Sequence, residues 1–80
     1  MSYQIIGERI KELRLENKLS QAKLGSLLLV SQVTVSLWEK GKSLPTAEYI
    51  IAMCKLFEIS ADYILGLVDY HLFKSNKKQG

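Results

Sequence analysis

The stretch SQVTVSLWEKGK, residues 31–42, decides between two folds for this chain. Its apolar residues at 33, 35 and 37 alternate with threonine and serine, which is typical of a half-buried β-strand. A strand there would need a partner strand to pair its backbone, yet the flanking stretches AKLGSLL and AEYIIAMCKLF both have helical patterns. We therefore predict a helix over residues 32–40, in which tertiary context overrides local propensity.

This helix would have an unusual outer face. It turns Val35 and Trp38 inward, whereas Gln32, Val33 and Leu37 point outward together, beside Ser36 and Lys40. Solvent-facing helix surfaces normally carry charged residues, so three neighbouring uncharged side chains indicate a surface that contacts another molecule.

Four positions carry the signature of a helix start, and one of them precedes the helix over residues 32–40. In each, a serine or threonine can accept hydrogen bonds from the first turn, while the residue before it can pack on the fourth helical residue. The four sites are Leu19-Ser20 with Leu24, Val30-Ser31 with Val35, Pro45-Thr46 with Ile50, and Ile59-Ser60 with Ile64. Together with an opening helix over residues 4–17, they predict an all-α fold, a compact bundle of five helices.

Composition limits the function classes. With 80 residues the chain is one domain at most, and 48% hydrophobic with 24% charged residues is a globular profile. The single cysteine, Cys54, cannot form an internal disulfide, and the first residues carry charges where a signal peptide would be apolar, so we expect a cytoplasmic location. No apolar run approaches the roughly 20 residues that span a bilayer, so no membrane partner is expected.

The net charge of +3 is weak support for nucleic-acid binding. Three of the eleven basic residues and none of the eight acidic ones lie in residues 74–80, so residues 1–73 carry equal numbers of each. An electrostatic case for DNA binding therefore depends on where the fold places its charges.

The two short helices that begin after Ser20 and Ser31 form a helix-turn-helix. The stretch LSQAKLGSLLLVSQVTVSLWEKGKSLPT, continued by SADYILG, resembles the phage repressor and Cro family of DNA-binding domains, over roughly residues 6–66. The resemblance implies a sequence-specific regulator of transcription, of repressor type, with the helix 32–40 in the major groove of double-stranded DNA and two copies acting as a homodimer. It divides the chain into a helix-turn-helix domain, residues 1–66, and a C-terminal segment, residues 67–80.

The resemblance also assigns roles to single residues. Gln32 is the candidate for a direct base contact, because its amide can donate and accept at once, and Val33 and Leu37 offer apolar contacts to thymine methyl groups. Arg14 and Glu39 match a structural ion pair of the family. The residues expected at the phosphates are Ser20, Gln21, Ser31, Thr34, Lys40 and Lys42.

The chain departs from the family pattern at two positions. Leu29 stands in the turn where glycine is usual because the backbone φ is positive, so either the leucine is strained by about 1 kcal/mol or the turn is built differently. Gly25 stands where alanine is usual, which allows close approach but weakens its helix by up to about 1 kcal/mol.

The fourth helix has two apolar stripes, one of Ile50, Cys54 and Phe57 and another of Tyr49, Met53 and Leu56. One small core does not easily use both, so we expect the first in the core and the second covered by something else. Either the apolar segment 67–73 folds back over it, or a second copy of the chain contacts it in a dimer. The basic residues of 74–80 would add loose phosphate contacts or simply promote solubility.

Enzymatic activity is not expected. His71 is the only histidine, and no nucleophile, carboxylate pair, glycine-rich phosphate loop or metal-ligand spacing accompanies it, so we expect no metal, no cofactor and no small-molecule ligand. The alternative to DNA binding is a protein-binding adaptor or antitoxin-like partner that uses the face at Val33 and Leu37.

Overall fold

The computed structural model describes residues 3–69. Within those residues there is no strand, and the segment that alternates like a strand is a helix, so the all-α prediction is confirmed. The sequence predicted both ends of two helices, over residues 4–17 and 32–40, and each of these ends lies within one residue of its predicted position. The five helices are α1 (Tyr3–Glu16), α2 (Gln21–Leu28), α3 (Gln32–Glu39), α4 (Ala47–Phe57) and α5 (Ala61–Ile64).

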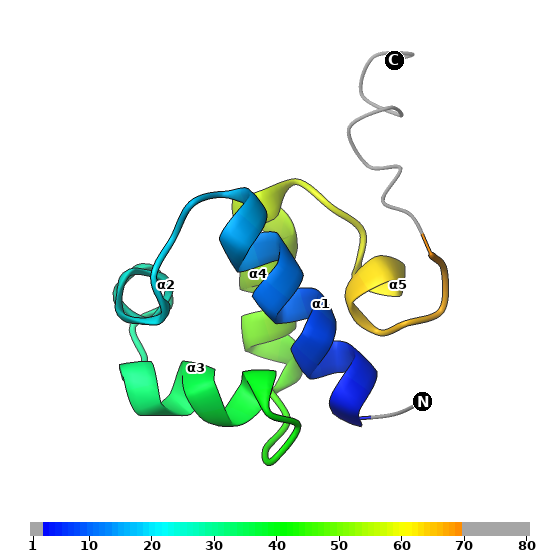
Figure 1. The fold of residues 1–80 in the computed structure, drawn as a ribbon. Helices are drawn as coiled ribbons and strands as arrows, with labels where there is room; N and C mark the ends of the chain where they lie inside the picture. The colour runs from blue at the N-terminus through cyan, green and yellow to red at the C-terminus, as the bar shows by residue number, and fades with distance from the viewer. Residues whose placement is uncertain (1–2, 70–80) are drawn as a thin grey trace.

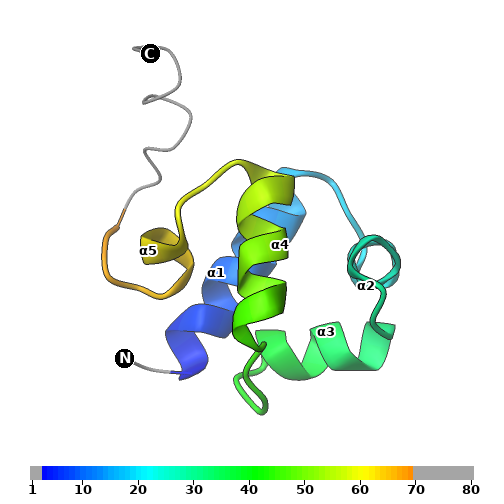
Figure 2. The ribbon, with the colours of Figure 1, turned by 180° about the vertical axis from the view of Figure 1, so that it is seen from behind.

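Two long helices occupy the centre of the bundle. In Figure 1 α4 lies behind α1, and from behind, in Figure 2, α4 is in front. The short helices α2 and α3 lie on one side of this pair and α5 on the other. Because α3 packs chiefly against α2 and α1, its outer face remains at the edge of the molecule.

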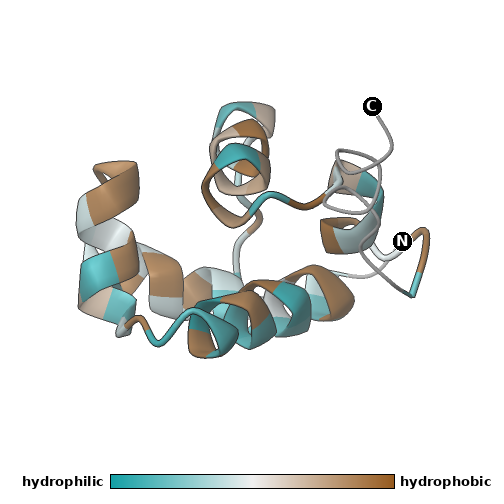
Figure 3. Cartoon of the chain, turned by 90° about the horizontal axis from the view of Figure 1, so that it is seen from above, coloured by the Kyte–Doolittle hydropathy of each residue, from teal (hydrophilic) through white to brown (hydrophobic). Residues whose placement is uncertain are grey.

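One hydrophobic core lies between the helices. Figure 3 shows hydrophilic and hydrophobic residues on different sides of the helices, as expected for amphipathic helices that share a core. The residues in it that are least exposed to solvent are Ile6, Ile10, Leu13, Leu24, Val35, Met53, Ile59 and Ile64.

The four predicted N-caps all begin helices. Ser20, Ser31 and Ser60 each accept a hydrogen bond from the backbone N–H three residues later, at 2.9, 3.1 and 3.4 Å. Thr46 precedes α4 without a side-chain hydrogen bond. Each of the three serine hydrogen bonds pairs a backbone N–H that the start of its helix would otherwise leave unpaired.

Three of the helix connections share one design. Each has a non-glycine residue in the left-handed region, Lys18, Leu29 or Glu58, with φ of 58°, 62° and 57°. The residue that follows is apolar, and its N–H donates to the carbonyl five residues earlier at 3.0, 2.8 and 3.1 Å, as in a Schellman motif. A serine cap then starts the next helix. These connections begin Lys18-Leu19-Ser20, Leu29-Val30-Ser31 and Glu58-Ile59-Ser60.

Gly7 brings α1 against the C-terminal end of α3. A Cβ at this position would lie 2.3 Å from the carbonyl oxygen of Trp38 and 2.8 Å from that of Glu39, so only glycine allows this approach. The contact fixes α3 on the helix that carries Arg14.

The prediction for α4 was wrong at Met53. This side chain is 0% exposed and lies in the core with Ile50 and Phe57, so it cannot contact a second copy. Because α2 and α5 both pack against α4, its buried face is centred on Met53, and Cys54 is only half-buried at the edge. The two other predicted dimer contacts are Tyr49, whose ring lies 5.5 Å from that of Trp38, and Leu56, which is exposed.

The first residues of the C-terminal segment pack on the domain. The guanidinium of Arg9 donates to the carbonyl oxygens of Tyr63 and Val68 at 3.1 and 3.0 Å, and it lies over the Tyr63 ring at 4.1 Å from the ring centre. Val68 is half-buried against the core. Residues 67–69 therefore belong to the folded domain, while the predictions made for 70–73 and for the basic tail 74–80 lie outside the described residues.

Candidate nucleic-acid interface

The starts of α2 and α3 lie together. Gln21 and Gln32 are the first residues of these helices, and Gln32 Nε2 donates to Gln21 Oε1 at 2.6 Å. The helix-turn-helix thus brings two amide side chains and two helix N-termini to one place. Helix N-termini carry partial positive charge and unpaired N–H groups, which suit a phosphate.

The two serine caps keep a donor for such a phosphate. The hydroxyl oxygen of Ser20 accepts from the Lys23 backbone, and that of Ser31 accepts from the backbone of Thr34. A hydroxyl that accepts can still donate its own proton. The Ser31 and Thr34 hydroxyl oxygens are also 3.0 Å apart, so either of them can donate to the other.

The outer face of α3 is exposed and uncharged, as predicted. Val33 is 61% exposed and Leu37 37% exposed, although both are hydrophobic. Lys40 and Lys42 follow at the end of α3 and are exposed. This arrangement provides an apolar surface for base methyl groups with cations at its border.

The turn between α2 and α3 keeps the usual left-handed backbone in spite of its leucine. Leu29 has φ 62° and ψ 39°, and its side chain is 90% exposed. Gly25 is buried against this turn, where a Cβ would lie 2.7 Å from the Val30 carbonyl oxygen. An alanine at 25 would therefore require this turn to shift.

Arg14 and Glu39 form the ion pair that the family resemblance assigned. Arg14 Nε donates to Glu39 Oε2 at 2.6 Å and Nη2 donates to Oε1 at 3.1 Å, with the two side chains only 9% and 3% exposed. The hydrogen bond to Glu39 raises the pKa of Arg14 above its ordinary value. Arg14 Nη1 also donates to the Leu19 carbonyl at 2.8 Å, which fixes the chain just before α2.

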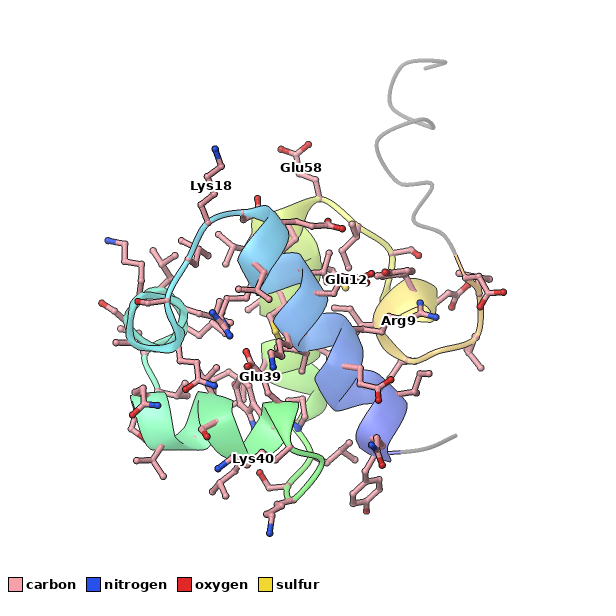
Figure 4. All side chains as sticks on the ribbon, viewed as in Figure 1. Arg9, Glu12, Lys18, Glu39, Lys40 and Glu58 are labelled. Atoms are coloured by element: carbon pink, nitrogen blue, oxygen red, sulfur yellow. The ribbon has the colours of Figure 1, made fainter. Side chains whose placement is uncertain are left out.

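One contact was missed by the sequence reasoning. Gln21 Nε2 donates to Glu39 Oε1 at 3.0 Å, so Gln21 joins the ion pair to Gln32. Figure 4 shows Glu39 on the inner side of α3, facing α1. No pattern along the sequence indicates this contact, because it depends on how α2 crosses α3.

The fold separates the charges that balance along the sequence. Residues 20–46 contain Lys23, Lys40 and Lys42 but a single acid, Glu39, which is paired inside. The seven other acidic residues lie on α1, α4, α5 and the segments after them. In Figure 4 Lys40 lies at α3, whereas Glu12 and Glu58 lie away from it. The exposed charged residues of the helix-turn-helix and of the turn after it are therefore all lysines.

Other site chemistry is sparse in the part of the chain that the structure describes. No three histidine, cysteine or acidic side chains of residues 3–69 are grouped to hold a metal ion. Among the same residues, no helix is long and apolar enough to cross a membrane. Burial raises the pKa of the Cys54 thiol, which disfavours its reactive thiolate form.

Comparison with known proteins agrees with this geometry. The chain is 40% identical over 65 residues to repressor protein C2 of Salmonella phage P22, and the matched stretch covers 81% of this chain and 30% of that protein. It is 42% identical over 60 residues to the HTH-type transcriptional regulator DicA of Escherichia coli (strain K12), covering 75% of this chain and 44% of the regulator. The chain thus spans less than half the length of either relative.

A solved structure extends the similarity to three dimensions. The crystal structure of the P22 c2 repressor in complex with synthetic operator 9T superposes with a TM-score of 0.69 at 39% identity, covering 74% of this chain and 89% of that one. Residues 10–64 match the family model described as Helix-turn-helix. The chain therefore belongs to the helix-turn-helix family, and within it is homologous to the phage-type repressors.

Proposed function

We propose that the chain binds double-stranded DNA sequence-specifically and regulates transcription as a repressor, with α3 in the major groove. The observation that carries this proposal is the exposed, uncharged face of α3 between two helix N-termini and two lysines. A major groove is wide enough for one α-helix, and its bases present both hydrogen-bonding groups and thymine methyls to that helix. Its similarity to a repressor solved with operator DNA supports the same function.

Each group on this face has a distinct task. Gln32 reads a base edge, while Val33 and Leu37 contact methyl groups and contribute no charge. The phosphate contacts come from the start of α2 and from the lysines after α3, and they fix the position of the helix without reading sequence. Because the partner is DNA, the proposal includes the cytoplasmic location expected from the sequence.

The test compares Gln32→Ala with the wild-type chain on a set of DNA duplexes. A site is first selected by the wild-type protein from a pool of random duplexes, and each of its base pairs is then varied. Loss of a bidentate base contact should reduce discrimination at one position of each half-site by about 1–3 kcal/mol and leave non-specific affinity nearly unchanged. Equal weakening on every duplex would contradict base reading by Gln32.

We also propose that the chain acts as a homodimer, since helix-turn-helix domains of this kind read two half-sites about one DNA turn apart. Because Met53 is buried, we propose instead the groove between α4 and α5 as the dimer surface, and it is lined by Leu44, Ile51, Ala61 and Leu65 among others. Ile51 is 55% exposed there.

Sedimentation equilibrium tests this surface. Ile51→Glu should shift the chain toward monomer mass, because a charge would be buried in an apolar interface. Leu15→Glu is the matched control, as Leu15 is equally exposed at 56% but lies on α1. The homodimer would be excluded if the wild-type chain has monomer mass without DNA and if its complex with the selected duplex contains only one copy of the chain.

A further inference from the structure

The buried ion pair is connected to the base-reading side chain by an unbroken series of hydrogen bonds. Arg14 donates to Glu39, Gln21 donates to Glu39, and Gln32 donates to Gln21, with donor–acceptor distances between 2.6 and 3.1 Å. The series runs from a side chain buried between α1 and α3 to the outer face of α3. It is therefore a route by which a residue that does not touch DNA can act on one that does.

The chemistry of the groups fixes the direction of every bond. A guanidinium can only donate, and the carboxylate of Glu39 can only accept. The amide of Gln21 must consequently turn its Nε2 toward Glu39, which leaves its Oε1 facing Gln32. An oxygen that accepts requires a donor opposite it, so Gln32 must present its own Nε2 to Gln21. The orientation of both amides follows from the charge at Glu39.

This orientation decides what Gln32 can offer to a base. One N–H of its amide is used by Gln21, so the outward groups are the second N–H and the carbonyl oxygen. In the major groove adenine presents an acceptor at N7 and a donor at N6, which match one donor and one acceptor. Guanine presents two acceptors, N7 and O6, and would require two N–H donors.

We propose that Glu39, held by Arg14, is a positioning residue for sequence recognition, which orients the amide of Gln32 so that it selects adenine and rejects guanine. This inference rests on the proposed function, because it requires that Gln32 read a base. It gives the ion pair a second role beyond stability. Arg14 contributes twice, since its Nη1 also holds the Leu19 carbonyl immediately before α2.

The substitution Glu39→Gln tests the inference because it replaces one accepting oxygen of the carboxylate by a donating NH₂ group at nearly constant shape. The new carbonyl oxygen should keep the shorter bond from Arg14 Nε, which is 2.6 Å in the wild type. The new NH₂ group then replaces Oε1, gives up the 3.1 Å bond from Arg14 Nη2 and faces Gln21. Gln21 must then accept instead of donate, and both glutamine amides turn over. Both N–H groups of Gln32 would face outward, which suits guanine.

Arg14→Lys is the matched control. It weakens the same buried pair and lowers the melting temperature, but it leaves an acceptor-only carboxylate at Glu39 and hence the same amide orientation. A second variant, Gln21→Ala, keeps the ion pair and the fold while it removes the link to Gln32. Affinities are measured at temperatures well below each melting transition, which is followed by circular dichroism.

The measured quantity is the ratio of affinities for duplexes with adenine or guanine at the position read by Gln32. That position is the one at which the wild-type preference disappears in Gln32→Ala. We expect a wild-type ratio of roughly 5 to 150. In Glu39→Gln the ratio should fall at least about tenfold, in Gln21→Ala it should approach one, and in Arg14→Lys it should change less than about twofold.

The inference is overturned if Glu39→Gln and Gln21→Ala keep the wild-type ratio, or if Arg14→Lys loses the ratio to the same extent as Glu39→Gln. Failure of the proposed function gives a different result. In that event the wild-type chain selects no sequence, or Gln32→Ala changes the preference at no position.

Discussion

Replacement of Leu29 by glycine should stabilise the domain. Leu29 has φ 62° and ψ 39°, a conformation that costs a residue with a Cβ about 1–2 kcal/mol. Glycine removes this strain, while its larger freedom in the unfolded chain costs about 0.4–1 kcal/mol. The leucine side chain is 90% exposed, so little packing is lost. The difference of these ranges centres on a net gain of about 0.8 kcal/mol, or a rise in melting temperature of roughly 3–6 °C for a domain of this size.

Thermal unfolding followed by circular dichroism measures this change, and Leu29→Ala is the control. Alanine keeps the Cβ and therefore the strain, and it removes only the exposed part of the side chain. Its free energy of unfolding should stay within about 0.5 kcal/mol of the wild type. If the glycine variant melts at or below the temperature of the alanine variant, the left-handed turn is not a source of strain and the reasoning is refuted.

Three further outcomes are expected. Glu39→Ala should lower the free energy of unfolding by about 3–5 kcal/mol in denaturant titrations, because it leaves a buried guanidinium without its partner, whereas a loss below 1 kcal/mol would mean that the pair is solvated. Lys42→Ala should weaken binding to all duplexes alike and reduce the salt slope by about one unit, while Lys55→Ala on α4 should leave the slope unchanged. Burial and the hydrogen bond to Glu12 raise the pKa of Tyr63 from 10.0 to about 12. The neutral Tyr63 side chain should therefore contribute its full stability below pH 10 and lose it as the pH rises to 12, as measured by the free energy of unfolding. A Tyr63→Phe variant that shows the same alkaline loss of stability would contradict this.

The sequence predicted those parts of the fold that depend on neighbours along the chain. The serine caps and their apolar partners identified the helix starts, because capping is a contact over three or four residues. The helical state of residues 32–39 was also accessible, since an unpaired strand could be excluded. The family pattern then assigned the partners Arg14 and Glu39, which are 25 residues apart.

Other features depended on the three-dimensional packing and could not be obtained in this way. The apolar positions of α4 fit two helical stripes, and only the placement of α2 and α5 against it determines that Met53 is buried. The hydrogen bond from Gln21 to Glu39 requires the crossing of α2 and α3, and Arg9 reaches Val68 only through the return of the chain beside α1. Side-chain chemistry limits such contacts without specifying them.

The repeated helix connection also bears on the speed and order of folding. Each closes a hydrogen bond between residues only five apart, so it can form as soon as its own segment exists, without a distant partner. Helical domains dominated by such local contacts fold in microseconds to milliseconds, whereas a ribosome adds about 5–20 residues per second. The α1–α2 and α2–α3 connections can therefore close while later residues are still being added. The hydrogen bond from Arg9 to the Val68 carbonyl joins positions 59 residues apart and must be among the last contacts to form.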